Sequence, residues 1–408
     1  MISFDVPESI RQTVTMIDSV ATEMMRPAAR YFDDHEHEIP WDYINFMHDV
    51  LRAAGGMTMA PSQSGEDGEV RQDYQRLAHY VEVLSWGDAG LYLCTPRGGL
   101  GAAAVAAAGT PEQIARFLAR FQDDKPVFSA MAITEPQAGS DTAAIKTTAA
   151  RDGDEWVLNG EKIFVTGGHK SLVDTPGFVV VWATIDPSAG RKGIRSFVVE
   201  AGTSGCTVTK IEKKLGIRSS DTASIVLQNC RVPIENMLGK LEEEKKTTEG
   251  YKGVMRTFEA TRPLVAASAL GIARAALEFL KEKLSEHGIE VRYGLPRSRM
   301  TNLEREVIDM EVMLRSAWLL TIRAVWMVDE RVPINAEASM SKIKAGDAVV
   351  RITQKAVELL GPMGYSREHL LEKWFRDGKI NDLYEGTGQI NRLIVARRIL
   401  GYSRKELN

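Results

Sequence analysis

The spacing of apolar residues changes twice along this chain, and this feature restricts its fold more than any other. Up to about residue 127, apolar side chains recur three and four positions apart, as in SIRQTVTMIDSVATEMMRPAARYF and DYINFMHDVLRA. From 128 to 240 the apolar runs are short, and from 241 onward long helical periods return. The sequence therefore predicts an α+β chain with a helical domain over 1–127, a β-domain over 128–240 and a helical bundle over 241–408.

The middle segment has the pattern of a small barrel or sandwich. EWVLNGEKIFVTGG contains two strand-like runs on either side of Asn159-Gly160, a dipeptide typical of tight hairpins. GFVVVWATI, RSFVVEA, GCTVTKIE and TASIVLQNCRVP follow, separated by turn residues. No GxGxxG loop follows a strand, so a Rossmann dinucleotide site is not predicted. The charged run KLEEEKKTTEGYK is expected to be a solvated connection between the β-domain and the bundle.

Composition limits the possible partners. A chain of 408 residues with a net charge of −4 has no global basic field that would attract nucleic acid or an anionic membrane. No uninterrupted apolar run approaches the roughly 18–20 residues that span a bilayer. The thiols Cys94, Cys206 and Cys230 lack metal-type spacing, and their scatter indicates a reducing compartment. We expect a cytoplasmic protein without a metal site, a nucleic-acid partner or a membrane span.

Two short segments combine polar side chains with turn residues. Thr134, Ser140 and Asp141 follow a short strand, where they either present donors to a polar ring edge or begin a helix with Ser140 or Asp141 as its N-cap. Glu385 precedes Gly386 and the helical run QINRLIVARRIL. That glutamate is either a catalytic base or a carboxylate that complements the helix dipole, and the residues alone leave both open.

Four segments resemble the acyl-CoA dehydrogenase family in their order and separation. They are AITEPQAGSD at 132–141, GEKIFVTGG at 160–168, KLGIRSSDTASIVLQNCRVPIENMLG at 214–239 and LYEGTGQINRLIVARRILG at 383–401. The resemblance covers nearly the whole chain. It implies an N-terminal helical domain, a central β-barrel domain and a C-terminal four-helix bundle. It also implies FAD as the cofactor and α,β-dehydrogenation of an acyl-CoA thioester to trans-2-enoyl-CoA.

The resemblance implies that Glu385 is the base that removes the α-proton while a hydride passes from the β-carbon to flavin N5. Donors must also stabilise the charge that develops on the thioester oxygen. The family places the backbone N–H of Glu385 and a flavin ribityl hydroxyl there. Some relatives carry the base immediately before the position of Arg262, but this chain has Thr261 there, so only the site at Glu385 holds a carboxylate.

The same resemblance implies further contacts. Residues expected at the flavin or the pantetheine chain are Met131, Ile133, Thr134, Ser140, Phe164, Thr166 and Thr387, and those expected at the substrate are Ser140, Phe258, Arg262, Tyr384 and Gly386. Phe164 stands where the family commonly has Trp, so it keeps the stacking area and loses an N–H donor. On residues alone, Phe164 could instead belong to the barrel core, and Arg262 to an interdomain ion pair.

The half of the flavin site that family members lend to a neighbouring subunit departs from the family pattern. His287 stands where an Arg is expected, Glu358 replaces a Gln, and Gly361-Pro362 replaces Gly-Gly. A proline lacks the backbone N–H, and a glutamate repels a diphosphate. The candidates for compensation are Arg292, Arg297 and Arg299. Both a homotetramer with such compensation and an α2β2 heterotetramer with a related subunit stay open.

The reaction and the acyl group are each open to more than one interpretation. The implied electron acceptor is an electron-transfer flavoprotein or a similar protein. A flavin-dependent oxidase or monooxygenase on the same fold, or a supporting subunit of a heteromeric dehydrogenase, are the rival functions. The stretch from Cys94 to Gly101 interrupts a helical pattern with one proline and three glycines, where the family closes the acyl pocket. It either makes room for a bulky acyl group or is an ordinary loop.

Overall fold

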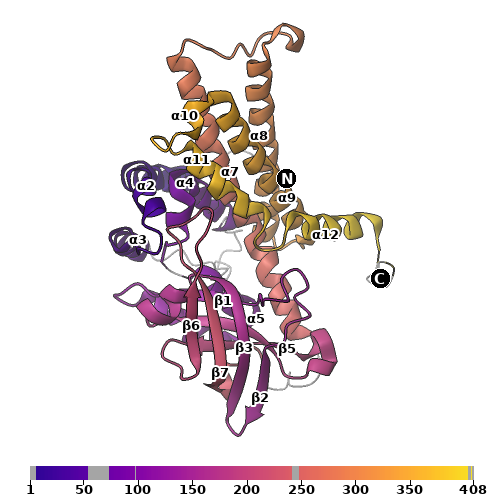
Figure 1. The fold of residues 1–408 in the computed structure, drawn as a ribbon. Coiled ribbons are helices and arrows are strands. Elements are labelled where there is room, and N and C mark those ends of the chain that lie inside the picture. The colour runs from indigo at the N-terminus through magenta and orange to yellow at the C-terminus, as the bar shows by residue number, and fades with distance from the viewer. Residues whose placement is uncertain (1–5, 54–72, 97, 241–247, 403–405, 407–408) are drawn as a thin grey trace.

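The structure of the chain is a computed structural model that describes residues 6–53, 73–96, 98–240, 248–402 and 406. Helices come first, a single sheet follows, and long helices complete the chain (Figure 1). This order confirms the predicted α+β class. The switch in the spacing of apolar residues is what separates the three parts, because a period of 3.6 buries one face of a helix and a period of 2 buries one face of a strand.

The N-terminal part consists of helices that pack around an apolar core. They are α1 (Glu8–Val20), α2 (Arg26–Asp34), α3 (Trp41–Ala53), α4 (Asp73–Tyr92), α5 (Gly99–Ala108) and α6 (Pro111–Leu118). Thr110 and Gln113 begin α6 with a reciprocal capping box. α4 is broken at Asp88, whose backbone angles of −163° and 121° are not helical. The end of α4 therefore takes a direction of its own.

The central part is a seven-stranded sheet. Its strands are β1 (Ser129–Ala132), β2 (Thr148–Asp152), β3 (Glu155–Thr166), β4 (Phe178–Thr184), β5 (Ile194–Glu200), β6 (Cys206–Ile211) and β7 (Thr222–Pro233). The order is β1-β4-β2-β3-β7-β6, with β5 paired to β4. β1 and β2 run parallel to β4, and the other pairs are antiparallel.

The predicted hairpin at Asn159-Gly160 is wrong. β3 runs through both residues, and the pairing of β3 with β7 shifts register between Leu158 and Gly160. A Cβ atom on Gly160 would lie 2.4 Å from the hydroxyl oxygen of Thr147. Asn159 accepts a hydrogen bond from the backbone N–H of Asn229 at 2.8 Å. The dipeptide therefore serves a bulge in which two backbones pass closely, and not a two-residue turn.

The C-terminal part is built on three long helices. The helices after the sheet are α7 (Glu249–Glu286), α8 (Asn302–Asp329), α9 (Asn335–Leu360), α10 (Pro362–Tyr365), α11 (Leu371–Gly378) and α12 (Gly388–Leu400). α7 also extends to the side of the sheet at β5 (Figure 1). Most of the predicted charged connection, residues 241–247, lies outside the described residues, and α7 begins within its last part.

By length and composition, α7 holds a stretch apolar enough to cross a membrane, although charged residues interrupt its apolar runs. Of that stretch, 83% is buried inside the fold. Leu270, Ala273 and Leu277 of α7 belong to the same apolar cluster as Ile352 of α9. α7 is therefore the central helix of the bundle core.

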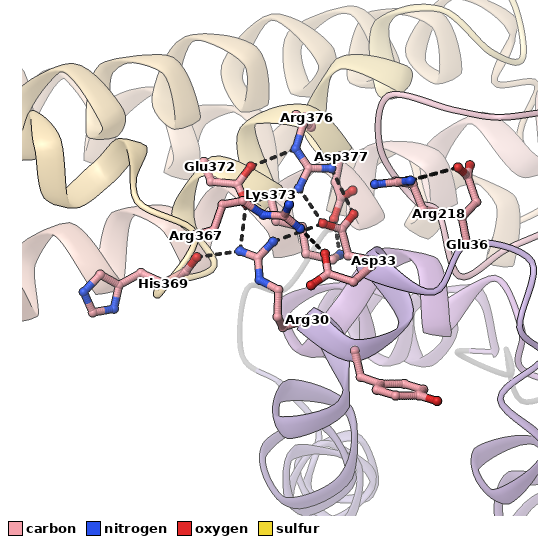
Figure 2. Close-up of polar contacts among 12 residues, drawn as sticks. Arg30, Asp33, Glu36, Arg218, Arg367, His369, Glu372, Lys373, Arg376 and Asp377 are labelled. Atoms are coloured by element: carbon pink, nitrogen blue, oxygen red, sulfur yellow. Dashed lines mark hydrogen bonds and ion pairs between the residues drawn. The ribbon is translucent and has the colours of Figure 1, made fainter.

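Ion pairs join the N-terminal helices to the C-terminal ones (Figure 2). On α11, Arg376 donates to Asp33 of α2 at 2.6 Å and to Glu372 at 2.8 Å. Arg30 of α2 pairs with the same Glu372 at 2.7 Å. Burial acts to raise the pKa of Asp33, but the bonds from Arg376 hold that pKa below its usual value. The docking of α11 on α2 therefore depends on charge.

Lys373 joins all three parts of the chain. Its ammonium group is buried between the carboxylates of Asp88 on α4 and Asp377 on α11. Asp377 also accepts the backbone N–H of Ile217, from the segment before β7, at 2.6 Å. Asp88 accepts the N–H of Leu91 at 2.8 Å, which fixes the break in α4.

Replacing Lys373 with Met is expected to lower the free energy of unfolding by about 3–5 kcal/mol, because two buried carboxylates would lose their shared cation. Urea denaturation of the two proteins would measure the difference. The control is Lys210→Met, which removes an exposed ion pair with Glu212 and should cost about 1 kcal/mol or less. Equal losses in the two variants would contradict the role assigned to Lys373.

Candidate active site

A strained turn carries Glu385 between the 3-10 turn η8 (Lys379–Asp382) and α12. Glu385 has a φ of 53° and Gly386 a φ of 92°, so two consecutive residues are left-handed. For a residue with a Cβ this conformation costs about 1–2 kcal/mol. The turn is held by two donors to the carbonyl of Gly386, from Lys342 at 2.6 Å and Asn391 at 2.7 Å. Strain of this kind is concentrated at functional sites.

α7 fixes both ends of Glu385. The hydroxyl of Thr261 donates to the carboxylate at 2.6 Å, and the guanidinium of Arg262 donates to the backbone carbonyl at 3.2 Å. Thr261 therefore positions the carboxylate of Glu385. Thr387 completes the turn, because its hydroxyl accepts the N–H of Ile390 at 3.3 Å and caps α12.

The surroundings of Glu385 favour a carboxyl group that can accept a proton. Burial raises the pKa of Glu385, and the bond from Thr261 and the charges of Arg262 and Lys342 offset only part of that effect. The same burial lowers the pKa of Lys342 to about 8, although Glu385 acts to raise it. A carboxylate with a raised pKa is better matched to proton abstraction near neutral pH.

The predicted substrate residues surround this turn. Phe258 and Arg262 are 8% and 5% exposed, and the guanidinium lies 5.7 Å from the centre of the Phe258 ring. Arg262 bonds to the main chain of Glu385, so an interdomain ion pair is not what the structure shows. Tyr384 donates to Asn381 at 3.0 Å, and burial raises its pKa.

The polar turn after β1 does not begin a helix. Residues 142–147 are not helical, so the possibility of a helix N-cap at Ser140 or Asp141 is wrong. Glu135 and Ala138 exchange backbone hydrogen bonds of 3.1 and 3.0 Å across a tight turn. Ser140 is exposed beyond this turn. Met131 and Ile133 are buried in the apolar cluster that also contains Phe258.

Glu135 is a positioning residue that the sequence alone did not reveal. Its buried carboxylate accepts from Lys162 of β3 at 2.7 Å and from the backbone N–H of Lys146 at 2.6 Å. Burial acts to raise its pKa, but Lys162 and these donors hold it at about 2. The signal in the sequence was weak, since a glutamate beside a proline in a turn is usually exposed. This pair fixes the turn against β3.

Phe164 lies on the surface and not in the core. It is 61% exposed with a φ of 58°, while the next residue, Val165, is 1% exposed. A register shift between Lys162 and Val165 turns the ring outward. Ile163 donates its backbone N–H to the carbonyl of Thr134 at 2.9 Å, which places the turn after β1 beside this aromatic. Apolar area beside hydroxyl groups, including Thr166, suits a flat heteroaromatic ring such as the isoalloxazine of FAD.

The predicted residues thus form two groups. Glu385, Gly386, Thr387, Arg262 and Tyr384 meet at one turn, whereas Thr134, Phe164 and Thr166 meet at the end of β3. Within the residues that the structure places, no hydrogen bond connects the two groups directly. A bound molecule that contacts both is consistent with this separation.

The residues that depart from the family pattern lie on the surface of the bundle. His287 donates from Nδ1 to the carbonyl of Lys283 at 2.7 Å, and Glu358 pairs with Lys355 at 2.7 Å. Two of the possible substitutes already have carboxylate partners. Arg292 bonds to Glu304 at 2.6 and 2.9 Å, and Arg297 bonds to Asp309 at 2.7 Å through both terminal nitrogens.

Comparison with known proteins gives matches along the chain. The acyl-CoA dehydrogenase N-terminal, middle and C-terminal domain families match residues 7–125, 130–230 and 248–400. The short-chain specific acyl-CoA dehydrogenase, mitochondrial, of Rattus norvegicus is 33% identical over 403 residues, which cover 98% of this chain and 92% of the relative.

Solved structures agree in fold. Butyryl-CoA dehydrogenase from Megasphaera elsdenii superposes with a TM-score of 0.83 at 30% identity, covering 98% of this chain and 100% of the other. A chain from a study of the electron-transferring flavoprotein of Acidaminococcus fermentans and flavin-based electron bifurcation gives a TM-score of 0.83 at 31% identity. It is matched over 98% of this chain and 100% of its own length.

Replacing Thr261 with Val should raise the pKa of Glu385 further, because the hydroxyl bonds to the charged form of the carboxylate and its removal disfavours that form. Infrared titration of the carboxyl band, assigned by its loss in Glu385→Gln, would measure this pKa. Thr261→Ser keeps the donor and serves as the control, with a pKa close to that of the unchanged protein. A pKa that is unchanged or lower in Thr261→Val would contradict the assigned contact.

Proposed function

The chain belongs to the acyl-CoA dehydrogenase family, and from this premise we propose that Glu385 is the base that removes the α-proton of its substrate. The protein is an FAD-dependent enzyme that dehydrogenates acyl-CoA thioesters. The observation that carries the proposal is the half-buried carboxylate of Glu385, which is held by Thr261 on a left-handed turn and has a raised pKa. A base of this kind contributes typically about 10²–10⁴-fold to the rate.

The turn provides both the base and a donor. The backbone N–H of Glu385 bonds to no carbonyl within the described part of the chain, so it can donate to the thioester oxygen as negative charge develops there. Arg262 holds the carbonyl of the same residue and so fixes the orientation of the turn. FAD, when bound, accepts the hydride that leaves the β-carbon. The residues of the chain move the proton and orient the thioester.

We propose that the outward-facing end of β3 holds the flavin ring. Phe164 offers its exposed face, and Thr134, Thr166 and Ser140 offer hydroxyl groups nearby. The buried ion pair of Lys162 with Glu135 holds the turn after β1 against β3. Thr387 would contact the flavin from the same turn that carries Glu385. These contacts are consistent with a ring placed between β3 and the turn at Glu385.

We propose that the acyl group is short. Several relatives with similar sequences are named as short-chain specific, and butyryl-CoA dehydrogenase has the same fold. The glycines in the stretch from Cys94 to Gly101 also support a short acyl group. A Cβ on Gly99 would lie 2.8 Å from the carbonyl oxygen of Ser129. A Cβ on Gly101 would lie 2.6 Å from the Cβ of Ser129. These glycines let α5 lie directly on β1, so they do not enlarge an acyl pocket.

We propose an electron-transfer flavoprotein or a similar protein as the acceptor, and a cytoplasmic location. The similarity to a chain from a study of such a flavoprotein supports the acceptor. The three cysteines are free, which agrees with a reducing compartment.

We propose further that the chain assembles as an α2β2 heterotetramer with a related subunit. Glu358 and Pro362 disfavour a diphosphate, and Arg292 and Arg297 are each neutralised by a carboxylate. Arg299 is the remaining candidate for compensation. A partner with an intact half-site would supply what this chain has lost.

Glu385→Gln is expected to lower kcat/KM for butyryl-CoA by about 10²–10⁴-fold with FAD still bound, because an amide cannot accept the α-proton. Dye-linked dehydrogenation and flavin absorbance would measure the two quantities. Unchanged activity with bound flavin would show that another base acts. In the unchanged protein, hydrogen peroxide formed in step with substrate consumption would favour an oxidase, and a lack of dehydrogenation with any acyl-CoA would favour a supporting subunit.

The chain purified alone should hold well below one FAD per protomer. The variant His287→Arg, Glu358→Gln, Pro362→Gly restores the side chains and the backbone N–H of the family pattern, and it should retain more flavin after gel filtration. The control combines Lys210→Met with Arg151→Gln, two exposed changes on the β-domain. One FAD per protomer in the unchanged chain would contradict the heterotetramer.

A further inference from the structure

Lys342 is a buried cation that contacts the turn at Glu385. It lies on α9 and is 1% exposed. Its Nζ donates to the carbonyl oxygen of Gly386 at 2.6 Å, and this is its one hydrogen bond within the part of the chain that the structure describes. Taking an ammonium group out of water is costly, whereas Met would occupy similar space without a charge. The position of Lys342 therefore indicates a role in the turn beyond packing.

The same carbonyl oxygen has a second donor, which is neutral. Asn391 of α12 is fully buried and donates from Nδ2 to Gly386 at 2.7 Å. Hydrogen bonds with one ionised partner are roughly twice as strong as bonds between neutral groups. Of the two donors, Lys342 therefore contributes the larger share as long as it carries its charge.

The conformation of the turn requires strong contacts of this kind. Glu385 is left-handed with a φ of 53°, which is unfavourable for a residue with a Cβ. The backbone is also closely surrounded, because a Cβ on Gly386 would lie 3.2 Å from Nδ2 of Asn391. A residue in such a sparsely populated conformation persists only where its surroundings over-determine it. The bond from Lys342 is one of the contacts that keep Glu385 left-handed.

We propose that the ammonium group of Lys342 is a positioning group for the turn at Glu385, so that loss of its charge lowers the rate of proton removal. This inference rests on the proposed function, because it takes Glu385 as the base and its backbone N–H as the donor to the thioester oxygen. Both groups have to point at the same acyl-CoA. Their directions depend on the backbone angles of one residue, which the bond to Gly386 limits.

The charged groups around Lys342 come from several elements. Burial lowers the pKa of Lys342 to about 8, and the cations Arg262 of α7 and Arg392 of α12 act in the same direction. The carboxylates of Glu385 and of Asp382 in η8 act to raise this pKa and offset only part of the effect. Charged groups at the contacts of α9 with α8 and within α11 are paired: Arg323 with Glu337, Glu306 with Lys355 and Lys373 with Asp377.

The lowered pKa gives the effect a direction with pH. Below about pH 8 the ammonium group is charged and holds the turn. As the pH rises through this value, a neutral amine remains, and its bond to Gly386 is weaker. Glu385 has a raised pKa and must lose its proton before it can act as a base. We therefore expect kcat/KM to rise with pH as Glu385 ionises and to fall again near pH 8 as Lys342 is neutralised.

The test follows kcat and KM for butyryl-CoA from about pH 6 to about pH 10 in the FAD-loaded enzyme, with its partner subunit if one is required. Lys342→Arg keeps a charge across this range, because a guanidinium does not lose its proton, and it should abolish the fall near pH 8. Lys342→Met should lower kcat about tenfold or more at about pH 7, with little change in KM, because the turn is misplaced while the rest of the substrate is still bound.

Two controls separate the charge from the bond and from the fold. Asn391→Leu removes the neutral donor to Gly386 and keeps the ammonium group, so the fall near pH 8 should remain. Lys281→Met removes a lysine that pairs with Glu311 at the surface of the bundle, and it should leave the whole profile unchanged. Flavin absorbance checks that every variant is loaded to the same extent.

Several outcomes would overturn the inference. A fall near pH 8 that persists in Lys342→Arg would show that another group titrates there, and full activity in Lys342→Met would show that the charge is not needed. Loss of flavin from Lys342→Met would show that the lysine acts through the cofactor. A lack of dehydrogenation by the unchanged protein at every pH would instead contradict the proposed function.

A measurement without substrate decides the matter if the arginine does not fit the buried site. The charge of Lys342 acts to lower the pKa of Glu385, so Lys342→Met should raise that pKa further. Infrared titration of the carboxyl band would measure it. A pKa of Glu385 that is the same in Lys342→Met and in the unchanged protein would contradict the inference.

Discussion

The buried ammonium group of Lys373 is the contact on which the arrangement of the chain depends. It lies between a carboxylate of the N-terminal helices and one of the C-terminal helices, and the second of these also binds the backbone ahead of β7. A buried charge that loses its partner is strongly destabilising, so the pairing at Lys373 favours the observed arrangement of the three parts. Because Asp88 both pairs with Lys373 and breaks α4, the same contact fixes the direction of the last turn of α4.

The active site follows from this arrangement. α7 is long and central, and it brings Thr261 and Arg262 under a turn that comes more than one hundred residues later in the chain. That turn is strained at Glu385 and Gly386, and Lys342 of α9 and Asn391 of α12 hold it in place. On the opposite side, Glu135 and Lys162 fix the turn after β1 against β3. These contacts hold the turn at Glu385 and the turn after β1 in fixed positions, as catalysis by positioning requires.

The periodicity of the sequence predicts the three parts, because that period is a local property. The identity of Glu385 also follows from the sequence, since its motif is contiguous. Other features depend on residues that are distant in the chain. Asn159-Gly160 has the composition of a hairpin turn, yet the closeness of Thr147 makes it a bulge. Phe164 has the pattern of a core residue, and a register shift turns it outward. The close approach of α4 and α7 at Ser85 and Ser268 depends on the register of two helices that are far apart in the sequence.

Two glutamates of this protein, one buried and one half-buried, show how the placement of a cation decides the chemistry of a carboxyl group. Lys162 bonds directly to the carboxylate of Glu135, and the pKa of that residue is held at about 2 although burial acts to raise it. Arg262 and Lys342 also lie near Glu385, but they bond to backbone carbonyls of the turn and leave the carboxylate to a neutral hydroxyl. Burial therefore prevails at Glu385, and its pKa is raised. The first arrangement gives a permanent anion that fixes structure. The second gives a carboxyl group that is able to exchange a proton, in a turn that the same two cations keep rigid.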